Sequence, residues 1–216
     1  MSAEPRGPSP HLGVDAVVLA GGRGSRLGGV DKASLRVSGT TLLDRLVAAL
    51  GEAAAITRTV VVGPLTLPVG VEVLQTVEDP PGSGPVAALD AGLSALATAH
   101  RPADWTMVVA VDQPGAARAV PDLLRAVKQA DQSADSQRAP APQAWVPRDA
   151  EGRWQWLLAA YRTEPLRQAL QALPSPADVA MRRVFGALRV GDLSLDAGVL
   201  GDIDTPEDLA RWGVEP

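Results

Sequence analysis

The stretch that most constrains the fold of this chain is an apolar run that ends in a glycine-rich loop. Val14 to Ala20 is nearly continuously apolar, the pattern of a strand buried on both faces of a parallel sheet. The next residues read Gly21-Gly22-Arg23-Gly24-Ser25-Arg26. Glycines have no Cβ to keep a ligand from the backbone, and consecutive amides in such a turn form a concave anion site. Because Arg26 and Lys32 add positive charge, the loop is predicted to hold the phosphates of a nucleotide.

Two commoner phosphate-binding loops do not match this spacing. The P-loop requires Gly-Lys-Ser/Thr after a glycine and four residues, whereas Lys32 follows Asp31 and precedes Ala33. The dinucleotide pattern G-x-G-x-x-G can start at Gly22, but Leu27 takes the place of its third glycine. A purely structural turn is the remaining alternative, although such a turn needs fewer glycines and no basic residues.

Composition is typical of an α/β protein. The chain has 216 residues, 46% apolar and only 3% aromatic, so we expect one domain with a core of Val, Leu and Ala. The net charge of −5 and the absence of long basic runs give no attraction to nucleic acid. No apolar stretch reaches the roughly 20 residues of a membrane span, and neither a secretory signal pattern nor a cysteine is found. We therefore expect a cytoplasmic protein without nucleic-acid or membrane partners.

Strand-like and helical segments alternate along the chain. Strands are predicted at 14–20, 58–62, 71–74, 105–111, 143–147, 154–161 and 188–190, and helices at 42–50, 86–99, 121–128, 164–173, 178–185 and from residue 206. The alternation predicts a single-domain, Rossmann-like three-layer α/β/α sandwich with a mostly parallel sheet, whose ligands bind at the carboxyl ends of the strands. Residues 1–13 are predicted to be a disordered tail and residues 129–143 a mobile loop.

The strand-like run from Trp105 to Val111 ends in a carboxylate, Asp112. This position puts Asp112 at the carboxyl edge of the sheet, in the same crevice as the glycine loop. Mg²⁺ is commonly held by one or two carboxylates together with substrate phosphates and water. Asp112 is therefore a candidate magnesium ligand, with a helix cap or turn residue as the structural alternative.

The first motif, L-A-G-G-x-x-x-R-[ML]-G-x-x-D-K, resembles that of nucleotidyltransferases that activate small acceptors with nucleoside triphosphates. Within that superfamily the chain is most similar to the molybdenum cofactor guanylyltransferases, and the resemblance recurs in order from about Val14 to Trp212. It implies a fold of the nucleotide-diphospho-sugar transferase type and an NTP-transferase domain over residues 14–216. In the first motif it implies nucleotide binding by Leu19, Ala20, Gly21, Gly22, Gly24, Ser25, Arg26 and Lys32.

Asp79 with Gly84-Pro85 resembles the family's acid and G-P-L-A-G segment, which lines the nucleobase and ribose. An Asp side chain can accept from the ring N–H and the exocyclic amine of guanine together, which suits GTP. The helix that starts after Pro85 also supplies free N–H groups. Ala88 stands where the family has its last glycine, and Asp-Pro-Pro-Gly is also typical of an ordinary turn.

Asp112 matches the metal-binding aspartate of the family's Asp-x-Pro motif, so the resemblance implies Mg²⁺. Gln113 and Gly115 replace the larger apolar residues of that motif. Asp202 and Asp204 lie in a segment similar to the closing motif of the family, and at β spacing they share one face. They are candidates for a second metal ligand or for acceptor contacts, and a segment that only caps the next helix is equally consistent.

The resemblance implies Mg²⁺-dependent transfer of GMP from GTP to the phosphate of molybdopterin, with release of pyrophosphate. The predicted catalytic residues are Arg26, Lys32 and Asp112, which position the phosphoryl groups and neutralise their charge. An acceptor phosphate is already anionic and needs no protein base. This agrees with the histidines, because His11 and His100 cannot build a nucleophile–base triad.

Three alternatives stay open from the sequence. The enzyme could transfer CMP to molybdopterin, or it could transfer a nucleotide to another acceptor such as a sugar phosphate or phospholactate. It could also be a non-catalytic nucleotide-binding homologue, because Gln113, Gly115, Ala88 and Trp156 depart from the family pattern. Contact with molybdenum cofactor enzymes or chaperones is a further expectation.

Overall fold

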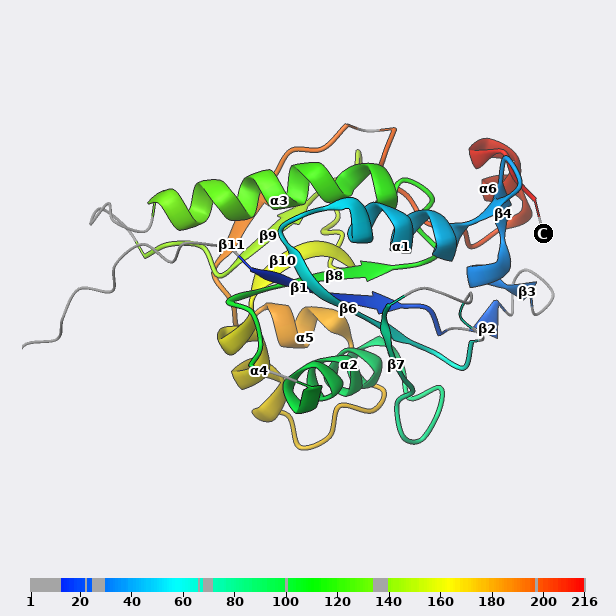
Figure 1. Cartoon of the computed structure of the whole chain (residues 1–216). Helices are drawn as coiled ribbons and strands as arrows, with labels where there is room; N and C mark the ends of the chain where they lie inside the picture. The colour runs from blue at the N-terminus through cyan, green and yellow to red at the C-terminus, as the bar shows by residue number, and fades with distance from the viewer. Residues whose placement is uncertain are drawn as a thin grey trace, which may run out of the picture.

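A seven-stranded sheet forms the middle of the molecule (Figure 1). The computed structural model describes residues 13–21, 23–24, 30–65, 67, 72–99, 101–133, 140–196 and 198–215. The strand order is β11-β9-β10-β8-β1-β6-β7. The strands are Val14–Leu19 (β1), Ile56–Val62 (β6), Leu74–Thr76 (β7), Trp105–Ala110 (β8), Ala144–Pro147 (β9), Leu158–Arg162 (β10) and Val190–Leu193 (β11).

The sheet is mostly parallel, as the alternation of strands and helices predicts. The central strand β1 pairs in parallel with β6 on one side and with β8 on the other. The exception is β10, which runs antiparallel to both β8 and β9. The strands predicted at 143–147 and 154–161 thus form an antiparallel hairpin, β9 and β10. The parallel pairing of β1 with its two neighbours puts the carboxyl ends of β1, β6 and β8 at one edge of the sheet.

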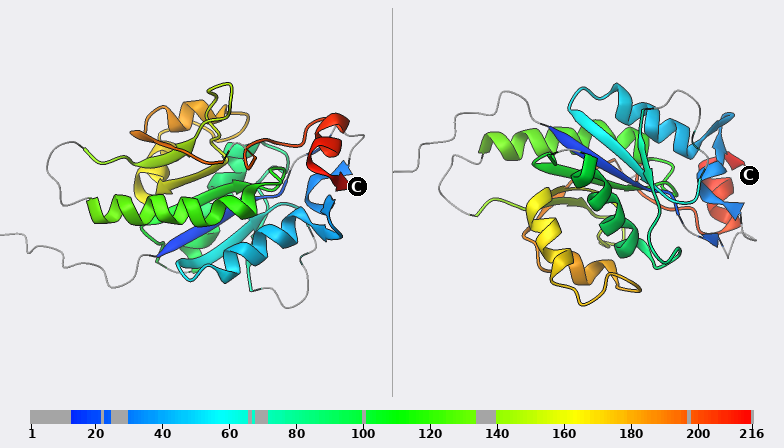
Figure 2. Two further views of the ribbon diagram at one scale, coloured as in Figure 1. Left: turned by 90° about the horizontal axis from the view of Figure 1, so that it is seen from above. Right: turned by 60° about the horizontal axis from the view of Figure 1, so that its bottom comes forward.

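Helices cover both faces of the sheet (Figures 1 and 2). One face carries α1 (Leu42–Glu52) and α3 (Ala116–Ser133), and the other carries α2 (Pro85–Ala99), α4 (Thr163–Gln171) and α5 (Met181–Phe185). The residues of β1 alternate between these layers, because successive side chains of a strand point to opposite faces. Ala16 and Val18 pack in the core with α1 and α3, whereas Val17 and Leu19 pack in the core with α2. The three-layer α/β/α architecture is confirmed.

Short elements gather at the carboxyl edge of the sheet. Strands Arg23–Gly24 (β2) and Val30–Asp31 (β3) form one antiparallel pair. Strands Arg36–Val37 (β4), Thr40–Thr41 (β5) and Val214–Glu215 (β12) form a second small sheet, and α6 (Pro206–Trp212) lies beside it (Figure 1). The pairing of β12 with β4 brings the last motif of the chain next to the first.

The predicted loop at residues 129–143 is wrong in its first third. Helix α3 starts five residues before the predicted start at Pro121 and continues to Ser133. The helix continues because Leu123, Val127 and Ala130 keep a buried stripe at helical spacing. Residues 134–139 and residues 1–12 of the predicted tail lie outside the described part of the chain.

The strand predicted at 154–161 is found at Leu158–Arg162 and so starts four residues later than predicted. Three further elements differ from the sequence prediction by three residues at one boundary. The strand predicted at 71–74 is found at Leu74–Thr76, and the strand predicted at 188–190 is found at Val190–Leu193. The helix predicted at 178–185 occupies only Met181–Phe185. All three lie at the periphery of the sheet, where short elements with few buried residues give a weak periodic signal.

Candidate active site

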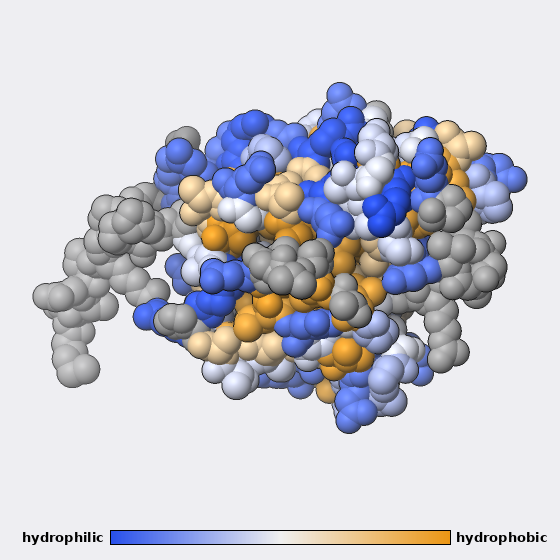
Figure 3. All heavy atoms as spheres, turned by 45° about the vertical axis from the view of Figure 1, so that its right-hand side comes forward, coloured by the Kyte–Doolittle hydropathy of each residue, from blue (hydrophilic) through white to orange (hydrophobic). Residues whose placement is uncertain are grey.

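A cavity of about 530 Å³ opens at the carboxyl edge of the sheet, within the size range of small-molecule sites. Seen from this end of the molecule, apolar residues gather in the middle of the surface between hydrophilic borders (Figure 3). The cavity is lined by the ends of β1 and β8, by the turn before α2 and by three charged residues, Lys32, Glu78 and Asp112. Its lining residues are Leu19, Ala20, Gly21, Lys32, Glu78, Pro81, Gly82, Gly84, Pro85, Ala88, Ala110, Val111, Asp112 and Leu157.

Lys32 is brought to the cavity by a short 3-10 turn, Lys32–Ser34, that follows β3. Asp31 caps this turn, because its carboxylate accepts a hydrogen bond from the backbone N–H of Ala33 at 3.0 Å. Asp31 and Lys32 are the Asp-Lys pair of the first motif. In this structure the aspartate holds the turn and the lysine reaches the site.

Two carboxylates meet the ammonium group of Lys32. Its Nζ lies 2.9 Å from Oδ2 of Asp112 and 2.7 Å from Oδ1 of Asp204. The side chains of Lys32, Asp112 and Asp204 are 15%, 28% and 45% exposed. Burial lowers the pKa of Lys32, but attraction to Asp112 and hydrogen bonds to both carboxylates outweigh it, so the pKa is raised above its usual 10.5. Lys32 therefore keeps its positive charge at neutral pH.

The segment before α6 is held against the end of β8 by backbone contacts. The N–H of Ile203 donates to the carbonyl of Asp112 at 2.9 Å. Ile203 is fully buried, whereas its neighbour Asp204 bonds to Lys32 and its neighbour Asp202 interacts electrostatically with Asp112, Asp204 and Lys32. A capping box starts α6, in which Thr205 and Asp208 exchange hydrogen bonds, so Thr205 is the N-cap of this helix.

Asp202 lies in an environment that disfavours its charge. Desolvation raises its pKa above 3.8, and repulsion from Asp112 and Asp204 raises it further, although much of the residue is exposed. These three aspartates therefore make one negatively charged group, and Lys32 offsets only part of its charge.

Gly115, a departure from the family pattern, has a structural reason. A Cβ at Gly115 would lie 2.1 Å from the carbonyl oxygen of Val199. Only glycine lets the segment that leads to Asp202 and Asp204 cross this close. Gln113 is buried, and its Oε1 has no hydrogen-bond partner among the described residues.

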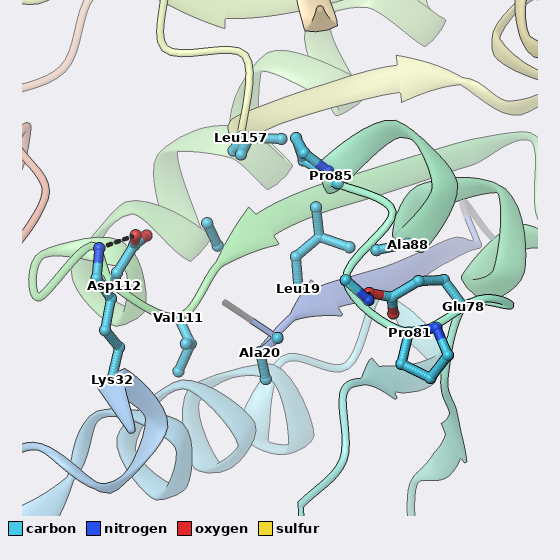
Figure 4. Close-up of a pocket in the computed structure, with 14 residues that line it drawn as sticks. Leu19, Ala20, Lys32, Glu78, Pro81, Pro85, Ala88, Val111, Asp112 and Leu157 are labelled. Atoms are coloured by element: carbon cyan, nitrogen blue, oxygen red, sulfur yellow. Dashed lines mark hydrogen bonds and ion pairs between the residues drawn. The ribbon is translucent and has the colours of Figure 1, made fainter. Parts of the chain in front are cut away.

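The other end of the cavity contains a buried acid that the sequence analysis did not select. Glu78 and Pro81 lie opposite the Lys32–Asp112 pair (Figure 4). Glu78 is only 8% exposed, and its Oε1 accepts a hydrogen bond from the N–H of Gly82 at 2.9 Å. Its Oε2 is buried and has no partner within the described part of the chain. A buried carboxylate oxygen without a donor costs free energy, so a ligand with an N–H group would be favoured here.

The structure places the predicted site residues differently. Asp204 and Asp202 lie near Lys32 and Asp112 but do not line the cavity. Leu19, Ala20, Gly21, Lys32, Gly84, Pro85 and Asp112 line the cavity, whereas Asp79 is exposed and does not. Gly24 lies in β2, and Gly22, Ser25 and Arg26 lie outside the described residues, so the phosphate role of that loop stays a prediction.

Glu78 was missed although it adjoins Asp79. The sequence feature that could have identified Glu78 is its position directly after the strand-like residues 74–77. Successive side chains of an extended segment point to opposite sides, so one of the two acids is buried and the next is exposed.

Aromatic residues of the β9–β10 hairpin pack on Phe185 of α5. Trp156 stacks on Phe185 with ring centres 5.2 Å apart, and Phe185 stacks on Tyr161 at 4.5 Å. Tyr161 is fully buried, and its hydroxyl donates to the carbonyl of Trp156. From this hairpin only Leu157 reaches the cavity wall.

The donor set of Asp112 and Asp204 fits a magnesium ion. Both carboxylates converge on one point, where the Lys32 nitrogen lies, and carboxylate oxygens are the ligands that Mg²⁺ prefers. Within the described residues there is no group of three or more His, Cys, Asp or Glu arranged to hold a metal. Two carboxylates suffice where substrate phosphates and water complete the coordination.

No helix in the described ranges is both long enough and apolar enough to span a membrane.

The fold is an α/β fold with a cavity of small-molecule size, and the family comparison makes the protein a nucleotidyltransferase. The sequence model of the MobA-like NTP transferase domain matches residues 16–192, and the chain belongs to this family. A curated relative from Natronomonas pharaonis, "Probable molybdenum cofactor guanylyltransferase", is 29% identical over 90% of this chain and 94% of its own length.

Solved structures share the fold at lower identity. Molybdopterin-guanine dinucleotide biosynthesis protein A from Archaeoglobus fulgidus has a TM-score of 0.62 at 19% identity, over 92% of this chain and 96% of its own. The 2-C-methyl-D-erythritol 4-phosphate cytidylyltransferase from Thermus thermophilus has a TM-score of 0.58 at 21% identity, over 90% and 95% of the two chains. At these identities the likeness shows the fold alone.

Proposed function

We propose that this nucleotidyltransferase transfers GMP from GTP to the phosphate of molybdopterin, with release of pyrophosphate. The observation that supports GTP most directly is the buried Oε2 of Glu78, at one end of the cavity, which has no hydrogen-bond partner among the described residues. Guanine presents a ring N–H beside an exocyclic amine, so it offers donors where adenine and cytosine offer a ring acceptor. The family and its curated relative support molybdopterin as the acceptor.

The charged end of the cavity is proposed to receive the phosphates. Lys32 would offset charge on the transferred and departing phosphoryl groups, and Arg26 is proposed to assist it. Asp112 and Asp204 would hold Mg²⁺, whose charge stabilises the phosphoryl oxygens when it is bound. With the acceptor phosphate already ionised, the contribution of the protein is to position the groups and to neutralise their charge.

A pyrophosphate-release assay tests the proposal. The protein is incubated with each of GTP, CTP, ATP and UTP, with Mg²⁺, and with or without molybdopterin. We expect release with GTP only when molybdopterin is present. Release with CTP and molybdopterin, or with a sugar phosphate or phospholactate as acceptor, would contradict the proposed substrates. Binding of GTP without turnover on any of these acceptors would identify a non-catalytic homologue.

A further inference from the structure

Lys32 already makes a bond to each of the two carboxylates proposed to hold the metal. The 2.9 Å and 2.7 Å contacts leave its ammonium group between Asp112 and Asp204. A divalent cation bound by the same two oxygens would need the same space. It would also be repelled by the ammonium, because two positive charges a few ångströms apart repel each other near a protein surface. Lysine and metal therefore compete for one position.

The surroundings make this competition strong. Only 15% of the Lys32 side chain is exposed, so solvent and salt screen its charge weakly. The nearby Asp202 adds a third negative charge to the group, which makes any cation at this position more favourable. Without a cation the three carboxylates would repel one another. In the described structure Lys32 bonds to both Asp112 and Asp204 and so holds the two carboxylates together.

A bound nucleotide offers Lys32 another partner. Lys32 lines the cavity as well as the carboxylate pair, and its flexible four-carbon stem can redirect the ammonium group. We propose that Lys32 occupies the divalent-cation position of the nucleotide-free protein and moves from Asp112 and Asp204 to the nucleotide phosphates when nucleotide and metal bind. This inference rests on the proposed use of a nucleoside triphosphate with a divalent ion.

The exchange couples the two ligands. A metal that enters without nucleotide must displace Lys32 and leave it without its carboxylate partners, so the metal should bind weakly. Nucleotide phosphates remove this cost, and by reciprocity the metal then raises the affinity for nucleotide by the same factor. The site thus favours the metal–nucleotide complex over either ligand alone.

Mn²⁺ binding without nucleotide is the first test. The free Mn²⁺ signal is followed by electron paramagnetic resonance during titration of the full chain and of Lys32→Met. Lys32→Met should bind Mn²⁺ at least about tenfold more tightly than the parent, which corresponds to about 1.4 kcal/mol. The control is Lys128→Met, because Lys128 is exposed and is the only other lysine in the chain. Adding Asp112→Asn to Lys32→Met should abolish the gain.

Equal or weaker Mn²⁺ binding by a folded Lys32→Met variant would overturn the proposal. If that variant fails to fold, as judged by circular dichroism, Lys32→Gln is used for the same comparison. This arm contains no nucleotide, so its outcome does not depend on whether GTP is the substrate.

The lysine signals of the unaltered protein give the second test. Because the chain has only two lysines, isotope labelling of lysine yields two side-chain resonances, assigned with the Lys128→Met variant. The probe is the α,β-methylene analogue of GTP with Mg²⁺, which cannot be cleaved at the reacting bond. The Lys32 resonance should shift and the Lys128 resonance should not. An unchanged Lys32 resonance at saturation, with binding verified by calorimetry, would overturn the exchange. Absence of binding in calorimetry would instead contradict the proposed function.

Discussion

Glu78 and Asp79 are neighbouring acids with opposite surroundings. Glu78 is buried on the cavity wall with one oxygen unpartnered within the described residues, whereas Asp79 is exposed outside it. Both could accept hydrogen bonds from guanine on chemical grounds. The difference between them is burial, because only a desolvated acceptor gains much from a ligand donor.

Glu78→Gln is expected to weaken GTP binding by about ten- to a hundredfold. The reason is that the amide supplies only one acceptor oxygen, which is already used by Gly82 N–H, and a hydrogen bond to a charged group contributes about 1.5–3 kcal/mol. Calorimetric titration with GTP measures the change. Asp79→Asn is the matched control and should bind GTP as the parent does. If Asp79→Asn weakened GTP binding and Glu78→Gln did not, Asp79 would be the acid that hydrogen-bonds to guanine.

Asp202→Asn should raise the free energy of unfolding at neutral pH. The pKa of Asp202 is higher in the folded protein than its usual 3.8, so the charged form opposes folding at any pH above the folded pKa. The substitution removes this cost. Urea unfolding at several pH values measures the effect, and the advantage of the variant should shrink as the pH falls toward 3.8. An advantage that does not change with pH would rule out electrostatic repulsion as its cause.

At the scale of elements, the site depends on how the segment before α6 crosses the start of α3. Gly115 precedes α3 and packs against the backbone of Val199, and Arg118 in α3 donates to the carbonyl of Gly198. The bond from Ile203 to Asp112 continues the attachment. Backbone contacts therefore determine where Asp202 and Asp204 lie.

Gly115→Ala is expected to destabilise the protein by about 1–3 kcal/mol and to slow nucleotidyl transfer. The new Cβ would overlap the Val199 carbonyl, so the segment with Asp204 must shift. Gly51→Ala is the control, because Gly51 lies in α1 with open space around its Cβ position, and alanine there should stabilise by up to about 1 kcal/mol. Chemical unfolding and the pyrophosphate assay provide the two measurements. If Gly115→Ala were as stable as the parent, the segment around Val199 could shift without a measurable loss of stability, which would contradict the prediction.

At the scale of the whole molecule, the cavity is built from the central sheet, the helical layer of α2 and the small elements beyond the sheet edge. The ends of β1 and β8 supply the floor of the cavity, the start of α2 supplies one wall, and Lys32 comes from the small strands beyond the sheet. A ligand that fills this cavity contacts parts of the chain that separate on unfolding. Its binding energy is therefore added to the free energy of unfolding.

GTP with Mg²⁺ is expected to raise the melting temperature more than any other nucleoside triphosphate. At a hundred times the Kd the stabilisation is about 2.7 kcal/mol, which corresponds to roughly 5–10 °C for a chain of this size. Differential scanning fluorimetry with the four triphosphates, with and without Mg²⁺, measures the order. A larger shift with CTP would favour a cytidylyltransferase.

The sequence by itself determined the three-layer fold and much of the cavity. The buried run of β1, the helical spacing of α1 and the Thr205-Pro206 start of α6 are local patterns, and local patterns are what periodicity and capping rules detect. The first motif also identified Lys32, and the strand end identified Asp112. Both line the cavity.

Only the tertiary structure decided which charges meet. Lys32 bonds to residues 80 and 172 positions away, and no local pattern predicts that one ammonium lies between Asp112 and Asp204. No local pattern predicts the role of Glu78 either. Glu78 and Asp79 are both acids, and only the fold decides that Glu78 lines the cavity and Asp79 does not. Local propensity acts over a few residues, whereas burial and ion pairing depend on segments that meet only when the sheet has formed.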